Sequence, residues 1–219
     1  PMHDERSEAV SAPKRRGRRA AVAIGVVAAV LIAAGAGFAV WHEQPGFCGA
    51  ICHTPMDGYL ATYEADPSGA AADKWGNEVA DASSMLASTH AGFGKTCLDC
   101  HEPTLAQQMG EGASWVTGGY EFPLAERTLG QLTAEVGKSA DEFCLNESCH
   151  NLTREDLVER TADMGVYNPH LSHHEELECG TCHKAHRASV MYCSQCHASA
   201  VVPEGWLSAD EANQLTDVA

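Results

Sequence analysis

The strongest hydrophobic pattern in this chain is an uninterrupted apolar stretch over residues 20–41, which carries no charged side chain. About twenty apolar residues are enough for a helix to cross a bilayer. Five basic residues stand directly before the stretch: Lys14, Arg15, Arg16, Arg18 and Arg19. Because basic residues are retained in the cytoplasm, we expect residues 1–19 to form a cytoplasmic tail and residues 20–41 a single-pass anchor of the cell membrane. Everything after residue 42 is then extracytoplasmic.

Two features of this stretch leave alternatives open. A cleaved signal peptide, including a twin-arginine one, has a similar charge pattern, but its apolar region is usually shorter and ends in an A-x-A cleavage site, which we do not find here. Small residues at four-residue spacing along the apolar stretch would let the anchors of two chains pack together, so a homo-oligomer is a possible assembly. These residues are Gly25, Ala29, Ala33 and Gly37.

Beyond the anchor, the pattern predicts short helices joined by irregular segments. A Ser or Thr followed three residues later by an acidic residue is a capping signature. It predicts helices that begin after Ser139, Thr153 (ending near Arg160) and Ser208, the last within a short C-terminal helix or tail at 206–219.

Residues 78–89 and 123–138 also have helical periodicity. Their apolar residues are expected to be buried: Val79, Leu86, Leu124, Leu132 and Val136. No alternating run is long enough to predict a sheet. The expected fold class is therefore mainly α with much irregular structure, preceded by one N-terminal transmembrane helix.

All ten cysteines fall into five close pairs, and a histidine directly follows the second cysteine of each pair. C-x-x-C-H is the attachment signature of c-type haem, in which two thiols hold the porphyrin and the histidine is an axial iron ligand. The motifs are Cys48/Cys52-His53, Cys97/Cys100-His101, Cys144/Cys149-His150, Cys179/Cys182-His183 and Cys193/Cys196-His197. We therefore predict five covalently bound haem c groups and an electron carrier.

The first and third motifs are widened, with three and four residues between their cysteines. The second cysteine and its histidine keep their relation, so the extra residues can bulge outward without moving the iron ligand. Zinc gives no reason for a histidine after every second cysteine. Disulfides within such short pairs would constrain the unfolded chain little, and a thioredoxin-like dithiol needs only one pair.

An outer part of this size is too small for five haems beside an ordinary apolar core. We expect the haems themselves to be the core of one cytochrome domain over residues 42–205. The wide gap between the second and third motifs divides it into a two-haem part, 42–125, and a three-haem part, 139–205. Only nine residues separate the last two motifs, so their haems are expected to be nearly in contact.

The outer part is strongly acidic, with 8 basic and 27 acidic residues after residue 42 and a net charge of −19. Such a charge argues against nucleic acid as a partner. It favours a partner with a basic docking face, although an acidic surface also serves solubility alone.

Histidines outside the motifs are candidates for the second axial position of each iron. His3 lies in the cytoplasmic tail and His42 at the membrane edge, so both are set aside. The distal candidates are His90, His170, His173, His174 and His186, together with Met56 for the first haem. Which ligand serves which haem is not assigned by the sequence.

The N-terminal half has its motifs in a defined order. An anchor comes first, then Cys48…Cys52-His53-Thr-Pro-Met56, and then Ser-Thr-His90 before Cys97-Leu-Asp-Cys100-His101. This order resembles the NapC/NirT type of membrane-anchored multihaem cytochromes, which includes the small subunit of cytochrome c nitrite reductase. The resemblance covers about residues 14–103. It implies that the protein oxidises menaquinol at the membrane, with the first haem as the entry point and Met56 as an axial ligand, and passes electrons to an extracytoplasmic reductase.

The chain departs from that family in three respects. It has five motifs where four are usual, Met56 stands one place later, and the lysine and aspartate of the quinol site are missing between Pro103 and Gly137. Quinol oxidation still needs a proton acceptor. Glu111 and Glu121 are the candidates, against the alternative that both are solvated surface carboxylates.

The segment from Leu177 through Cys179/Cys182-His183-Lys-Ala-His186 to His197 resembles the haem domain of flavocytochrome fumarate reductases. That resemblance covers about residues 170–200. It implies that His186 is a distal ligand and that the electron acceptor is a flavin-dependent reductase.

Three functions remain for comparison. The first is menaquinol oxidation with electron transfer to a reductase. The second is a multihaem reductase of nitrite or hydroxylamine type, which needs one iron with an open distal face. The third is an electron conduit that does not oxidise quinol.

Overall fold

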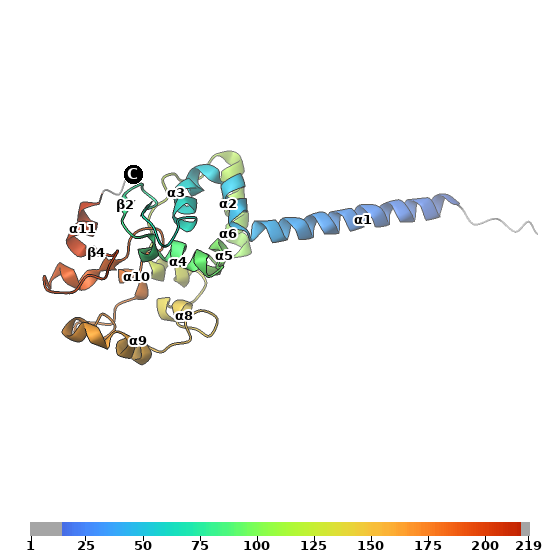
Figure 1. Ribbon diagram of the computed structural model, residues 1–219. Helices are drawn as coiled ribbons and strands as arrows, with labels where there is room; N and C mark the ends of the chain where they lie inside the picture. Colours follow the sequence, from blue (N-terminus) through green and yellow to red (C-terminus); the bar gives the residue numbers. More distant parts are fainter. Residues whose placement is uncertain (1–14, 216–219) are drawn as a thin grey trace, which may run out of the picture. The chain divides into compact units, whose positions relative to one another are not determined.

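The computed structural model describes residues 15–215, and Figure 1 shows the arrangement of their helices and strands. The chain divides into two units, residues 1–42 and residues 43–219. Most of the basic tail, with His3 and Lys14, lies outside the described residues.

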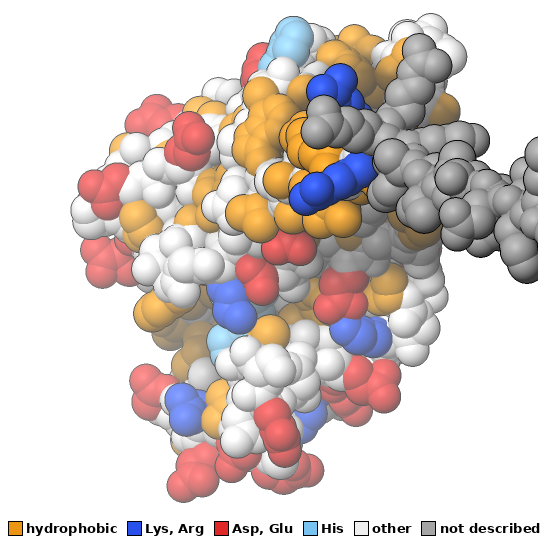
Figure 2. Space-filling view, turned by 90° about the vertical axis from the view of Figure 1, so that its right-hand side faces the viewer, with side chains coloured by type: hydrophobic (Ala, Val, Ile, Leu, Met, Phe, Trp, Pro, Cys, Tyr) orange, Lys and Arg blue, Asp and Glu red, His pale blue; other side chains and the backbone are white. Residues whose placement is uncertain are grey.

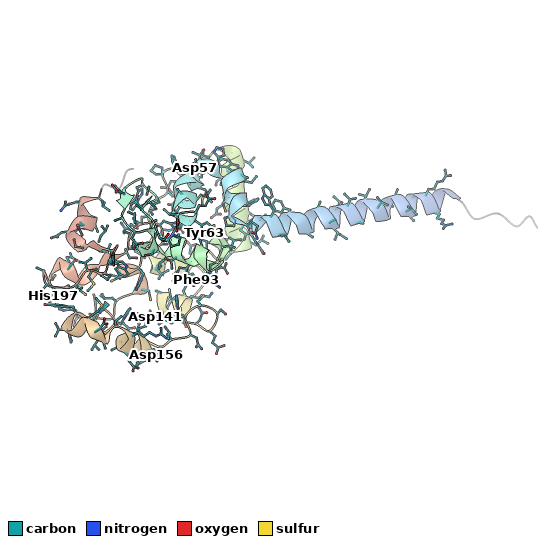
Figure 3. The ribbon with its side chains drawn as sticks, in the orientation of Figure 1. Asp57, Tyr63, Phe93, Asp141, Asp156 and His197 are labelled. Atoms are coloured by element: carbon teal, nitrogen blue, oxygen red, sulfur yellow. The ribbon has the colours of Figure 1, made fainter. Side chains whose placement is uncertain are left out.

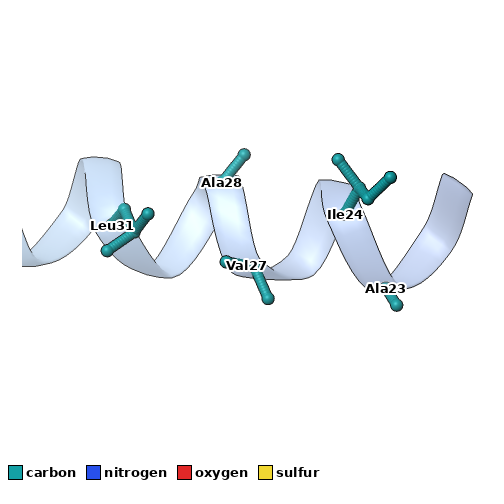
Figure 4. Close-up of a pocket in the computed structure, with 5 residues that line it drawn as sticks. All are labelled: Ala23, Ile24, Val27, Ala28 and Leu31. Carbon is teal, nitrogen blue, oxygen red and sulfur yellow. The ribbon is translucent and has the colours of Figure 1, made fainter. Parts of the chain in front are cut away.

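The first unit contains a single long helix, α1 (Arg15–His42). Its segment Gly17–His42 has a mean hydropathy of 2.4 and is the one helix among the described residues that is long and apolar enough to cross a membrane. The exposed apolar side chains drawn in Figure 4 are Ala23, Ile24, Val27, Ala28 and Leu31. An exposed apolar surface of this kind suits a lipid environment and not water.

The second unit is mostly helical, as expected, and its helices are short. They are α2 (Pro45–Ile51), α3 (His53–Tyr63), α4 (Leu86–Gly92), α5 (Cys97–Cys100), α6 (Leu105–Thr117), α7 (Leu129–Ala134), α8 (Ala140–Cys144), α9 (Arg154–Arg160), α10 (Cys179–Cys182) and α11 (Ala209–Gln214), with 3₁₀ turns η1 (Ala82–Ser84), η2 (Ala162–Tyr167) and η3 (Tyr192–Gln195).

The three helix starts predicted from capping signatures are confirmed. Ser139, Thr153 and Ser208 are the N-caps of α8, α9 and α11, and each side chain accepts a hydrogen bond from the backbone three residues on. In each case the acidic side chain three residues on accepts a hydrogen bond from the backbone N–H of the cap residue. Two backbone donors are therefore satisfied at the start of each of these helices.

The predicted helices at 78–89 and 123–138 are largely wrong. The first segment contains strand β2 (Glu78–Val79), η1 and only the start of α4, while the second keeps one short helix, α7. Val79 is buried as expected, but Leu124 is exposed. Pro123 and Gly137 bound the second segment, and neither residue supports a helix interior.

The prediction of no sheet needs a small correction, because four two-residue strands form two pairs. β1 (Ala71–Ala72) pairs with β2 in antiparallel fashion, and β3 (Val190–Met191) pairs with β4 (Leu207–Ser208) in parallel. Pairs this short close loops and do not constitute a core.

The apolar core of the second unit is small. Val79, Ala82, Met85 and Ala188 form its central cluster, and most buried apolar residues of the described chain are alanines. Two distant segments meet at this cluster. Met85 bridges to Lys184, and the N–H groups of Leu86 and Ser189 donate to Lys184 and Ser84. The segment after the fourth motif therefore lies beside the segment before the second.

Candidate functional site

Each predicted attachment motif is closed by a backbone hydrogen bond. In three motifs the histidine N–H donates to the carbonyl of the first cysteine: His101 to Cys97, His183 to Cys179 and His197 to Cys193, at 2.8–3.0 Å. One helical turn thus brings the two cysteines and the histidine together.

The widened motifs reach the same closure by different routes. The three residues between the cysteines of the first motif lie in α2, and the Cys52 N–H donates to the Cys48 carbonyl at 2.9 Å, so the two cysteines are one helical turn apart. In the third motif the His150 N–H still bonds the Cys144 carbonyl, at 3.2 Å. The loop between them turns on Asn146, whose side chain accepts from the Ser148 N–H. The added residues therefore leave the histidine in place.

Four motif histidines each face a second histidine at nearly the same separation. The ring centres are 6.0 Å apart for His90–His150, 6.3 Å for His101–His186, 6.4 Å for His170–His183 and 6.2 Å for His174–His197. A metal–imidazole bond is about 2 Å long, and a ring centre lies about 1 Å behind its nitrogen. Two imidazoles on opposite sides of one iron therefore have centres about 6 Å apart. Of the five histidine candidates for distal ligands, the structure brings four opposite motif histidines.

Three of these distal candidates have Nδ1 held by an acceptor. His90 Nδ1 lies 2.7 Å from the Leu86 carbonyl, which can only accept, so Nδ1 carries the proton. His186 Nδ1 lies 2.7 Å from Thr62 Oγ1. The Thr62 hydroxyl donates its own proton to the Tyr59 carbonyl, so it accepts the hydrogen bond from His186. Nε2 of both rings is then unprotonated, which is the atom and tautomer that binds a metal.

His170 is held in the same manner. Its Nδ1 lies 3.0 Å from Thr161 Oγ1, whose proton is directed to the carbonyl of Leu157 or the side-chain oxygen of Asn168. Burial also lowers the pKa of His183 to about 4 and that of His186 to about 3. Both rings are therefore neutral at physiological pH, as an iron ligand must be.

The first motif has different surroundings. His53 faces the ring of Trp115 at 5.9 Å, and Trp115 packs on Tyr120 at 5.0 Å. Indole offers no lone pair to a metal. Glu111 lies on the same helix, α6, and near the motif thiols. Burial raises the pKa of Cys52, and the Cys48 thiol and the Glu111 carboxylate raise it further.

The remaining candidates are less well placed. Met56 stands three residues after His53 on α3, and residues at that spacing share one helix face. It therefore suits an axial ligand on the His53 side and not one opposite to it. His173 is exposed and makes no ring contact with a motif histidine in the described part of the chain, and Glu121 is exposed.

Consecutive motifs are neighbours in space. The thiols of Cys48 and Cys97 are close enough for Cys48 to lower the pKa of Cys97 to about 7, and Cys144 lowers the pKa of Cys179 in the same way. Two further pairs complete the series: Cys100 with Cys149, close enough to interact electrostatically, and Cys182 with Cys193, adjoined by a bond from the Tyr192 N–H to Cys182.

The fifth motif lies at the surface of the second unit. Cys196 and His197 are exposed, and Figure 3 shows His197 at the edge of the domain, well away from Asp57 on α3. Residues 161–178 and 188–215 contain no Lys or Arg. The acidic residues of these segments are Asp163, Glu175, Glu176, Glu178, Glu204, Asp210 and Glu211. Acidic side chains are also spread over the face drawn in Figure 2.

Three observations indicate that the motif residues and the distal histidines suit covalently bound haem. In four motifs the histidine N–H closes on the carbonyl of the first cysteine, four imidazole pairs have the spacing of axial ligands, and Nε2 is free on three distal rings. The small core and the exposed Phe93, Val166 and Val201 also leave apolar surface for a large planar group to cover.

Three residues near the motif and distal histidines were missed by sequence reasoning: Thr62, Thr161 and Trp115. The hydroxyls of Thr62 and Thr161 set the histidine tautomers, and Trp115 faces His53. No sequence motif marks a threonine or tryptophan for these contacts, although Thr161 lies only nine residues from His170.

Comparison with known proteins gives consistent results. The cytochrome c3 family matches residues 127–198. The chain is 61% identical over 207 residues to the cytochrome c-type protein Cgr1 of Eggerthella lenta, covering 94% of this chain and 95% of that protein. It is 30% identical over 71 residues to the probable fumarate reductase Ifc3 of Shewanella frigidimarina, covering 32% of this chain and 11% of that protein. No solved structure matches it.

Proposed function

This chain belongs to the family of the cytochrome c-type protein Cgr1 and is a multihaem electron-transfer cytochrome, and we propose that it is a pentahaem quinol dehydrogenase subunit. In this proposal α1 anchors it in the cell membrane with its N-terminus in the cytoplasm. It takes electrons from menaquinol at the first motif and delivers them from the fifth motif to an extracytoplasmic reductase. Covalently bound haem supplies reversible one-electron chemistry at its iron.

The closeness of thiols from consecutive motifs, seen in their mutual electrostatic influence, is the observation that carries this proposal. Cys48–Cys97, Cys100–Cys149, Cys144–Cys179 and Cys182–Cys193 connect the five motifs in the order of the sequence. The chain's own residues therefore hold five redox centres as one row. His53, His101, His150, His183 and His197 are the proposed proximal ligands. His186, His90, His170 and His174 are the proposed distal ligands of the second to fifth haems.

The donor end of the row is assigned to the first motif. Only Glu43 and Gln44 separate α1 from α2, which begins the motif, so this motif is the nearest to the membrane along the chain. Oxidation of menaquinol releases two electrons and two protons. Glu111, beside the motif thiols on α6, is placed to accept a proton there.

The acceptor end is assigned to the fifth motif. Its Cys196 and His197 are exposed, as are residues of other motifs, and the segments around it carry only acidic charges. Such a surface suits a partner with a basic docking face, because complementary charges accelerate association. The similarity of residues within the C-terminal half to flavocytochrome fumarate reductases favours a flavin-dependent reductase as that partner.

The test is reduction of the haem-loaded protein in detergent by a menaquinol analogue, followed by haem absorbance. Rapid reduction of all five haems is expected. Failure with a full haem content would overturn the donor assignment. A matched control lacking residues 1–42 should be released from the membrane with its haems intact and lose efficient reduction by quinol in vesicles.

One observation favours a second candidate function. His53 faces an indole and not an imidazole, so the first haem is the place where an open iron would occur, as a nitrite- or hydroxylamine-type reductase requires. Addition of carbon monoxide to the reduced protein discriminates the two. Binding to one haem with turnover of nitrite or hydroxylamine would support a reductase, and absence of turnover leaves the electron-transfer role.

A further inference from the structure

Helix α6 has an exposed apolar stripe, formed by Leu105, Met109 and Val116. These residues lie within about 40° of one another on a helix of 3.6 residues per turn. Their exposed fractions are 72%, 68% and 84%. Trp115, which faces His53, lies about a quarter turn away from the stripe on the same helix. The side of α6 that approaches the first motif is therefore not the side that carries the stripe.

The α6 stripe lies in a nearly uncharged segment. Residues 103–120 carry one charged side chain, Glu111, in an outer part that has 8 basic and 27 acidic residues. Charged groups are costly to remove from water, so only a charge-poor face can enter lipid. Trp115 and Tyr120, whose rings are 5.0 Å apart, are of the two residue types that are enriched at membrane–water interfaces. The composition of this segment therefore suits a lipid surface.

Helix α6 is also held close to the start of the second unit. The rings of Trp115 and His53 are 5.9 Å apart, and Figure 1 draws α6 beside α2. Only Glu43 and Gln44 link α1 to α2, and α2 is about 10 Å long at 1.5 Å per residue. When α1 spans a bilayer, the length of this link therefore keeps α6 near the surface of the same bilayer.

We propose that the α6 stripe inserts into the lipid interface of the membrane that α1 spans, as a second membrane contact of this chain. The inference rests on the proposed anchoring by α1. A helix with one apolar side can lie in the plane of the interface with that side buried among the lipid chains. The two contacts together fix which side of the second unit faces the membrane. They hold the first motif at the surface from which a lipid-soluble quinol arrives.

The experiment introduces one cysteine into the full-length, haem-loaded protein in phosphatidylcholine vesicles. All ten native cysteines lie in the motifs, so haem attachment leaves the new thiol as the reactive one. Val116→Cys is on the stripe, and Glu159→Cys, at an exposed position of α9, is the control. Each variant is labelled with a lipid-soluble and with a charged, water-soluble maleimide. We expect the ratio of the two rates to be about tenfold higher for Val116→Cys, because apolar reagents concentrate in the bilayer.

Two outcomes would overturn the proposal. Equal ratios in the two variants would show that the stripe faces water. Slow labelling of Val116→Cys by both reagents would show that a haem or a second copy of the chain covers it, and a short bis-maleimide that joins two chains identifies the second copy. Met109→Cys repeats the measurement on the same side of α6 if Val116→Cys assembles poorly.

The proposed function is read separately in the same vesicles. Flotation with the vesicles reports the anchor, and reduction by a menaquinol analogue reports the donor assignment. Equal labelling ratios with normal flotation and reduction would reject the lipid contact of α6 and keep the proposed function. Loss of flotation would instead reject the anchoring by α1, on which the inference rests.

Discussion

The hydroxyl oxygen of Thr62 lies 2.7 Å from Nδ1 of His186, although the two residues are 124 positions apart in the sequence. Thr62 is fully buried on α3, and its own proton is directed to the Tyr59 carbonyl. It therefore acts as an acceptor for the histidine and leaves Nε2 free for iron. A residue of α3, the helix next to the first motif, thus orients His186, which follows the fourth motif, faces His101 of the second and is the proposed distal ligand of the second haem.

Replacing Thr62 by Val should weaken the ligation of one haem. The Val side chain has almost the same shape but cannot accept the His186 proton, which costs about 1–2 kcal/mol for the unpaired group. We expect unchanged haem content and a partial high-spin signal from one haem in magnetic circular dichroism. Thr62→Ser keeps the hydroxyl and should be normal. A low-spin spectrum in Thr62→Val would show that the hydrogen bond does not support the ligand.

His90→Ala should convert one haem, attached at Cys144 and Cys149, to a high-spin form that binds carbon monoxide. The reason is that His90 is the imidazole opposite His150. His173→Ala is the matched control, because this exposed histidine faces no motif histidine. Carbon monoxide binding is counted per chain in the reduced protein. A new binding site in His173→Ala, or none in His90→Ala, would refute the assignment.

Glu111→Gln should slow quinol oxidation about 10- to 100-fold while leaving the haem spectra unchanged, since loss of a positioned proton acceptor typically costs at least that much. The measurement is steady-state reduction by a menaquinol analogue. Glu121→Gln is the control with the same chemistry: both carboxylates are exposed, but only Glu111 is close enough to the Cys48 and Cys52 thiols to influence their pKa values. Equal rates in the two variants would assign no proton-accepting role to Glu111.

Arg154→Ala should destabilise the folded domain by about 1–2 kcal/mol at neutral pH. Arg154 bonds both oxygens of Asp141 at 2.6 and 2.7 Å and the Leu177 carbonyl at 3.0 Å, and the ion pair is partly exposed. This pairing holds the pKa of Asp141 below its ordinary value of 3.8. A lowered carboxyl pKa contributes stability above the ordinary value, and this is lost as pH falls through the folded value.

The difference in stability between Arg154→Ala and the unaltered protein should therefore be largest near pH 7 and shrink below about pH 4. Thermal unfolding across this pH range measures it. Arg160→Ala, an exposed change at the end of the same helix, should cost less than about 0.5 kcal/mol. A penalty for Arg154→Ala that stays constant down to pH 2 would exclude the ion pair as its cause.

Local sequence patterns predicted the features that depend on neighbouring residues. The apolar run at 20–41 predicted α1, and the pairs Ser139/Glu142, Thr153/Asp156 and Ser208/Glu211 predicted three helix starts. Each pattern succeeds because its partners lie within one helical turn. The helices expected at 78–89 and 123–138 failed because periodicity alone does not account for Pro123, Gly137 or the pairing of β1 with β2.

The sequence by itself determined the cofactor chemistry, since a thiol pair and its histidine are contiguous and carry their own geometry. Only the tertiary structure decided which distant histidine faces which motif, because His90–His150 and His101–His186 each join segments that lie far apart in the chain. The hydrogen bond between His186 and Thr62, 124 residues apart, is likewise set by packing. Contacts between residues far apart in the chain leave no periodic signal within either segment, so folding had to place them.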